Sequence, residues 1–189
     1  TCENCRLARA ARINPRKIRL YDDEADRPFA SVSSDIKGPL IESHGGLRYT
    51  IAFVDQATRM SKTYYMKKKS EAPKRLKEYF TWVKSLGWYV NLIRTDRGSE
   101  YFGNDTKHVQ KGDEKNFVEF EKVANAPEWG CRVEAGPRDG SKGNAIVERY
   151  HRTIFEIASS FLLNSHASPL FWVEAYRYAE YLHNRMVTG

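Results

Sequence analysis

The sequence predicts one α/β domain built on a mixed five-stranded sheet, with three antiparallel strands first and helices flanking the sheet. Three β-rich segments follow one another over residues 28–66 with no helical segment between them, and strands connected in this way pair antiparallel. Helical and β-rich segments then alternate over residues 70–134, and two long amphipathic segments follow. A chain of 189 residues suffices for one such domain with a proper core and is too short for two of ordinary size.

The opening strands are expected over residues 28–35, 47–55 and 60–66. A Gly-Gly turn at residues 45–46 precedes the second strand, which is rich in β-branched and aromatic residues. Asp55 ends that strand, and two interpretations of it are open. It caps the turn into the third strand, or it lies beside a site formed by other acids.

A helix is expected to start near Pro73, because a proline in the first turn gives up no helical hydrogen bond, and to end at Gly87. A strand over residues 88–95 follows this helix. A short helix around residues 117–124 and a fifth strand over residues 130–134 complete the sheet.

Two long helices close the fold. The first carries Glu148 near its start and has an apolar stripe at helical spacing, formed by Ile154, Ile157, Ala158 and Phe161. The second is expected over residues 168–184, with a stripe formed by Phe171, Trp172, Ala175, Tyr178, Ala179 and Leu182. We expect the two stripes to pack against each other.

Three acidic residues stand where an α/β sheet usually delivers functional side chains. Asp35 and Asp96 each end a β-rich segment shortly before a glycine, and Glu148 lies in the first turns of a helix that follows a glycine-bracketed loop. One carboxylate does not hold a catalytic metal, but two strand-end aspartates and one helix glutamate make an all-oxygen site suited to Mg²⁺ or Mn²⁺. These three residues are therefore the candidate metal ligands and catalytic residues.

The segments around these acids resemble, in order and context, the three acidic blocks of the DDE integrase catalytic core. The segments are Asp35-Ile-Lys-Gly-Pro, Arg94-Thr-Asp-Arg-Gly-Ser-Glu-Tyr and Gly143-Asn-Ala-Ile-Val-Glu-Arg-Tyr-His-Arg-Thr. The sequence is most similar to integrases of copia-type LTR retrotransposons, whose distal helix has a pattern matched here by Phe171, Trp172, Ala175, Asn184 and Arg185. The resemblance covers roughly residues 25–189, and three blocks in order are far more specific than any one of them.

The resemblance implies a ribonuclease-H-like fold and an enzyme of DNA integration encoded within a Pol polyprotein. It implies processing of element ends and strand transfer into target DNA by in-line phosphoryl transfer, with two Mg²⁺ or Mn²⁺ ions as cofactors. It also implies a homo-oligomer acting on DNA. Two alternatives remain open, namely a ribonuclease-H-like nuclease and a catalytically silent DNA-binding or assembly remnant of a retroelement. A metal-dependent end-joining assay separates them.

Four basic residues near Glu148 are candidate DNA contacts. Arg138 and Lys142 lie in the glycine-rich and proline-containing stretch over residues 136–143, a composition that favours a surface loop. His151 and Arg152 follow Glu148 at i+3 and i+4, so they are expected to share a helical face with it. The alternative is that both pair only with Glu148 or with solvent.

The charge distribution favours a polyanionic partner. Lysine and arginine exceed the acids by 31 to 24, which gives a net charge of +7. Basic residues are concentrated over residues 6–20 and again at Lys67, Lys68 and Lys69. The sequence has neither a run long enough to span a membrane nor a secretory signal pattern at its start, so we expect no membrane partner and action in the nucleus after a cytoplasmic assembly stage.

Cys2 and Cys5 form a Cys-x-x-Cys pair, which is half of a tetrahedral zinc site. The resemblance implies that they are the last two ligands of a zinc knuckle whose histidines precede the chain, so Zn²⁺ is expected only when those ligands are present. A chance pair is the alternative. The expected domains are residues 1–24, the end of the knuckle with a basic linker, and residues 25–189, the integrase core.

Overall fold

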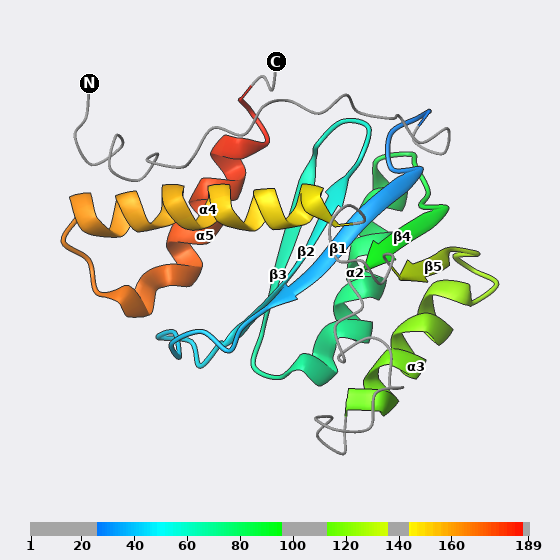
Figure 1. Ribbon diagram of the computed structural model, residues 1–189, viewed down its shortest axis with the longest axis horizontal. Helices are drawn as coiled ribbons and strands as arrows, with labels where there is room; N and C mark the ends of the chain where they lie inside the picture. Colours follow the sequence, from blue (N-terminus) through cyan, green and yellow to red (C-terminus); the bar gives the residue numbers. More distant parts are fainter. Residues whose placement is uncertain (1–25, 96–112, 136–143, 187–189) are drawn as a thin grey trace.

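The computed structural model describes residues 26–95, 113–135 and 144–186. Its strands are β1 (Ser31–Lys37), β2 (Tyr49–Asp55), β3 (Ser61–Met66), β4 (Leu92–Thr95) and β5 (Arg132–Ala135). They form one sheet in the order β3-β2-β1-β4-β5 (Figure 1). β1, β2 and β3 pair antiparallel, whereas β4 pairs parallel with both β1 and β5. The mixed five-stranded sheet with its antiparallel strands first is therefore confirmed.

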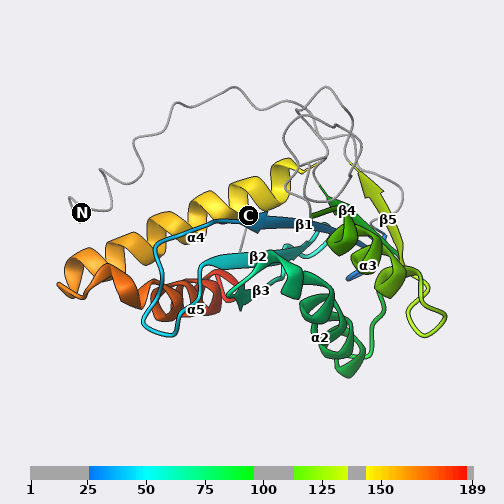
Figure 2. The ribbon, with the colours of Figure 1, turned by 90° about the horizontal axis from the view of Figure 1, so that it is seen from below.

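Helices cover both faces of this sheet, as Figure 2 shows for α4 on one side and α2 on the other. The helical elements are η1 (Lys69–Glu71), α2 (Ala72–Ser85), α3 (Asp113–Asn125), α4 (Ala145–Asn164), η2 (Pro169–Phe171) and α5 (Trp172–His183). Pro73 lies in the first turn of α2, as predicted. Among the described helices, none is long and apolar enough to cross a membrane.

The alternation of side chains along β2 divides the core into two layers. Ile51 and Phe53 belong to a cluster with residues of α2 and α3, while Ala52 and Val54 belong to a second cluster with residues of α4 and α5. This is the period-two alternation of a strand that is buried on both faces. Because Asp35 of β1 is paired with Ala52, it lies on the face that α4 covers.

The two closing helices pack against each other as predicted, through residues such as Ile154, Ala158, Tyr176 and Ala179. The predicted stripe of the last helix was partly wrong, because Phe171 and Tyr178 are 44% and 54% exposed. α5 begins only at Trp172, after the 3-10 turn η2, so Phe171 lies outside the helix.

Asp55 caps the turn between β2 and β3, which confirms the first of its two interpretations. Its buried carboxylate accepts hydrogen bonds from the backbone N–H of Phe29 at 3.0 Å and of Thr58 at 2.8 Å, and from the Thr58 hydroxyl at 2.6 Å. Phe29 has a φ of 62°, a left-handed conformation that is costly for a side chain of this size. Asp55 therefore fixes both the turn and the chain that enters β1.

Replacing Asp55 with alanine should lower the free energy of unfolding by about 1–3 kcal/mol, because the buried N–H of Phe29 loses its acceptor and Thr58 loses two hydrogen bonds. Urea denaturation would show this as a lower midpoint with an unchanged slope. The exposed Asp26→Ala variant is the matched control and should change the free energy by less than about 0.5 kcal/mol. A midpoint for Asp55→Ala equal to that of the control would contradict this role.

Candidate active site

β1 delivers the first predicted catalytic residue, Asp35, to the sheet face beneath α4. The neighbouring strand β4 runs parallel to β1, and its last residue, Thr95, is paired with Ser34. Asp96 follows Thr95 in the sequence and lies outside the described residues, as do Arg138, Lys142, Cys2 and Cys5.

The start of α4 is fastened to β1 by Asn144, the residue that precedes the helix. Its side chain is 5% exposed, and its amide Nδ2 donates a hydrogen bond to the backbone oxygen of Ser34 at 2.9 Å. Asparagine at this position usually caps its own helix. Here no capping bond forms from the side chain, which instead binds the strand one residue before Asp35.

His151 makes the second connection between α4 and β1. Its imidazole is 4% exposed, and its Nε2 lies 3.6 Å from Oδ2 of Asp35. Burial, with a smaller effect from the positive charge of Lys37, lowers the pKa of His151 to about 4 against an opposing hydrogen bond with the Asp35 backbone. The imidazole is therefore neutral near pH 7, and its contact with Asp35 is a polar contact between a neutral ring and a carboxylate.

Glu148 and Arg152 are exposed on α4, whereas His151, between them in the sequence, is buried against β1. The expectation that all three share one face was wrong, because Val147, His151, Ile154 and Ala158 form the buried stripe of the helix. Glu148 lies in the first turn, and its N–H donates to the Asn144 backbone oxygen at 3.1 Å. A DNA contact by His151 stays a prediction, and its burial favours a role in holding Asp35.

The oxygen donors of Asp35 and Glu148 suit a hard divalent cation. Within residues 26–95, 113–135 and 144–186, no group of three or more His, Cys, Asp or Glu side chains is arranged to hold a metal ion. The predicted ligand set includes Asp96, so its convergence stays a prediction.

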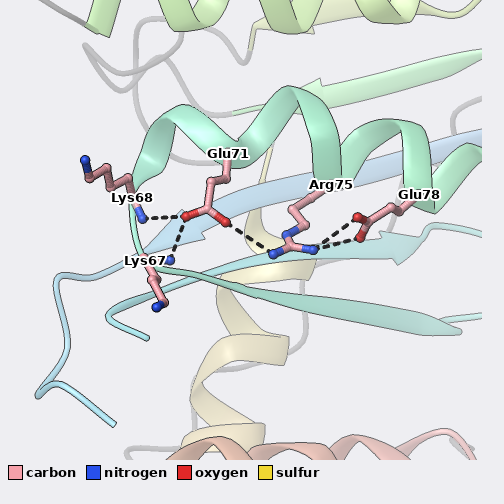
Figure 3. Close-up of polar contacts among 5 residues, drawn as sticks. All are labelled: Lys67, Lys68, Glu71, Arg75 and Glu78. Atoms are coloured by element: carbon pink, nitrogen blue, oxygen red, sulfur yellow. Dashed lines mark hydrogen bonds and ion pairs between the residues drawn. The ribbon is translucent and has the colours of Figure 1, made fainter. Parts of the chain in front are cut away.

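The second basic cluster surrounds the start of α2 (Figure 3). Glu71 accepts hydrogen bonds from the backbone N–H groups of Lys67 and Lys68, both at 3.0 Å, and its other oxygen lies 3.2 Å from Arg75. Arg75 also pairs with Glu78 at 3.0 Å. Arg75 is thus held between two glutamates. Glu71 binds the backbone N–H groups of Lys67 and Lys68 rather than their ammonium groups.

Sequence reasoning missed a polar junction between β3, α4 and α5. The Tyr150 hydroxyl lies 2.7 Å from Oγ1 of Thr63 and 3.2 Å from Oε1 of Glu180, and all three side chains are buried. Asn184 exchanges hydrogen bonds with the backbone N–H and C=O of Ser61, both at 2.9 Å. The available signal was the spacing of Glu180, which places an acid on the buried stripe of α5.

Comparison with proteins of known sequence links the chain to transposon polyproteins. It is 29% identical to the retrovirus-related Pol polyprotein from transposon TNT 1-94 of Nicotiana tabacum, over 97% of this chain and 13% of the relative. It is 27% identical to the Pol polyprotein from transposon RE1 of Arabidopsis thaliana, over 100% of this chain and 12% of the relative. The chain thus spans about an eighth of the length of these relatives. No family model matches it.

Solved structures share its fold. A chain of the simian T-cell lymphotropic virus intasome in complex with PP2A regulatory subunit B56 gamma has a TM-score of 0.63 and 17% identity, covering 100% of this chain and 59% of that one. The HTLV-2 integrase catalytic core domain in complex with magnesium, in a trimeric form, has a TM-score of 0.56 and 16% identity, covering 86% and 89%. The comparisons therefore confirm the resemblance to DDE integrases: the chain is homologous to part of the retrovirus-related Pol polyproteins of plant transposons and has the fold of retroviral integrase catalytic cores.

Proposed function

We propose that this chain is the catalytic core of a retrotransposon integrase, a polynucleotidyl transferase that processes DNA ends and joins them to target DNA. The observation that carries the proposal is the double attachment of α4 to β1. Asn144 and His151 bind β1 at Ser34 and Asp35, so the helix that carries Glu148 starts beside the strand that carries Asp35. The homology to transposon polyproteins and the integrase-core fold support it.

Asp35, Asp96 and Glu148 are the residues that would hold two Mg²⁺ or Mn²⁺ ions. When bound, such ions activate a water or 3′-hydroxyl nucleophile and stabilise the leaving oxygen at phosphorus. The HTLV-2 core is described in complex with magnesium, which supports a divalent cofactor. His151 packs against Asp35 as a neutral ring, so it orients the carboxylate without placing a cation beside it.

DNA is the proposed partner, and the nucleus the proposed place of action. Arg152 is exposed on α4, one turn beyond Glu148. Its guanidinium could there bind a DNA phosphate next to the catalytic acids. Arg138 and Lys142 precede α4 in the sequence and complete the proposed contacts. The neighbours include an intasome and a trimeric core, which supports action as a homo-oligomer on DNA.

Glu148→Gln should reduce Mn²⁺-dependent joining of DNA ends to background, because an amide replaces a charged metal ligand. DNA affinity should stay within about twofold, since the basic surface is unchanged. Glu156→Gln, two turns further along α4, is the matched control and should keep its joining activity. Joining by Glu148→Gln would refute the assignment, and metal-dependent cleavage of RNA in a hybrid without joining would favour the nuclease instead.

Arg152→Ala should weaken DNA binding about equally across sequences, because a phosphate contact carries no base specificity. The dependence of log K on log salt should become shallower by about 0.9, as expected for one lost phosphate contact. Fluorescence anisotropy at several salt concentrations measures both effects. Lys122→Ala, on α3 across the sheet, is the control and should leave the slope unchanged. Equal slopes for the two variants would remove Arg152 from the DNA interface.

A further inference from the structure

A buried carboxyl group at the far edge of the sheet is not used by the proposed chemistry. Glu180 of α5 is 9% exposed and lies against Tyr150 of α4. It also receives a hydrogen bond from the backbone of Thr63 on β3. Among the described residues, none of the ion pairs includes Glu180. Burying an acid outside any ion pair costs free energy, so we looked for the role that its contacts serve.

The strand register connects this junction to the active site. Asp35 of β1 is paired with Ala52 of β2, and Ala52 is paired with Thr63 of β3, so the three residues form one row across the sheet beneath α4. His151 contacts Asp35 at one end of the row, and Tyr150 contacts Thr63 at the other end. Ala52, in the middle of the row, belongs to the core cluster that includes residues of α4.

Two adjacent helix residues thus bind strands that are about 10 Å apart, twice the spacing of neighbouring strands. Successive residues of a helix point about 100° apart, so contacts at 150 and 151 on opposite flanks oppose rotation of α4 about its axis. Asn144 fixes the start of the helix at Ser34. Glu148 lies between these attachments. Any rotation or shift of α4 would therefore move its carboxylate relative to Asp35.

We propose that Glu180 is a positioning residue for Glu148, which acts by holding Tyr150 against β3 and so fixing the rotation of α4 over the active site. The proposal rests on the proposed function for the role of Glu148. Its structural part concerns only the attachment of α4 and needs neither metal nor DNA.

The protonation state of Glu180 gives this role a measurable signature. Burial raises its pKa to about 7, opposed by the charge of Lys62 and by hydrogen bonds from Thr63 and Tyr150. The other titratable or charged groups that face this junction are Tyr64 and Tyr65 of β3, Arg75 of α2, Arg177, Tyr181 and His183 of α5, and Arg185 just beyond α5. Arg75 is already paired with Glu71 and Glu78.

The sign of the effect follows from linkage. The folded chain keeps the Glu180 proton up to about pH 7, whereas the unfolded chain loses it near its ordinary value of about 4.5. The stabilisation is therefore complete below about pH 4.5, declines as the pH rises and is lost above about pH 7. The ionised carboxylate still accepts the Tyr150 hydrogen bond, but the cost of burying its charge outweighs that gain, so the junction becomes less stable and the hold on α4 weakens.

The test compares joining rates of the wild type with those of Glu180→Gln, which mimics the protonated acid at every pH. The ratio of wild-type to variant rate should fall about tenfold between pH 6 and pH 8, as the protonated fraction falls through a pKa of about 7. Glu174→Gln, an exposed substitution on the same helix, should give a flat ratio. Tyr150→Phe removes the connection without changing charge, so its rate should be low at both pH values and circular dichroism should show it folded.

Amide hydrogen exchange of residues 145–152, measured without metal or DNA, separates this inference from the proposed function. Corrected for the intrinsic effect of pH, exchange in the wild type should speed up above pH 7 relative to Glu180→Gln. Suppose that neither the wild type nor any variant joins DNA, but the wild type exchanges faster than Glu180→Gln above pH 7. The proposed function then fails, while the attachment of α4 by Glu180 stands. Equal exchange in the two proteins, or a rate ratio that does not change with pH, would overturn the inference.

Discussion

The structure depends on how α4 is fixed to the sheet. A carboxylate on a helix and another on a strand can serve one metal site only when the helix neither slides nor turns on the sheet. Asn144 and His151 prevent sliding by binding successive positions of β1, and both side chains are buried. The catalytic proposal therefore rests on two polar side chains that carry out no chemistry themselves.

Burial decides the protonation state of the side chains that hold α4. An imidazole on the surface would be partly charged near neutral pH, and beside Asp35 it would offset the negative charge that a cation needs. Burial and the nearby Lys37 lower the pKa of His151 to about 4, so the ring stays neutral. The same physics acts in the opposite direction on Glu180, whose pKa burial raises to about 7. Both groups are thereby neutral under mildly acidic conditions.

Much of the fold could be predicted from the sequence, because strands, turns and apolar stripes are local patterns, and the resemblance to integrase cores implied how the strands are arranged in the sheet. The capping role of Asp55 could be foreseen for the same reason, since Thr58, which donates hydrogen bonds to its carboxylate, lies only three residues away. The burial of His151 and Glu180 was not, because a polar residue is buried only when distant partners satisfy it. Asn184 shows the difficulty, since it binds Ser61 across 123 positions of sequence. Of the predicted catalytic residues, Asp35 and Glu148 are described, whereas Asp96 lies outside the described residues.

The central claim is that Asp35 and Glu148, from β1 and α4, contribute to one metal site. Calorimetric titration of the chain with Mn²⁺ tests it most directly, with Asp35→Asn and Glu148→Gln measured under the same conditions. The account predicts saturable binding by the wild type and its loss in both variants, because each carboxylate belongs to the same ligand set. Binding of equal strength by all three proteins would contradict it, and would leave the attachment of α4 as a feature of the fold alone.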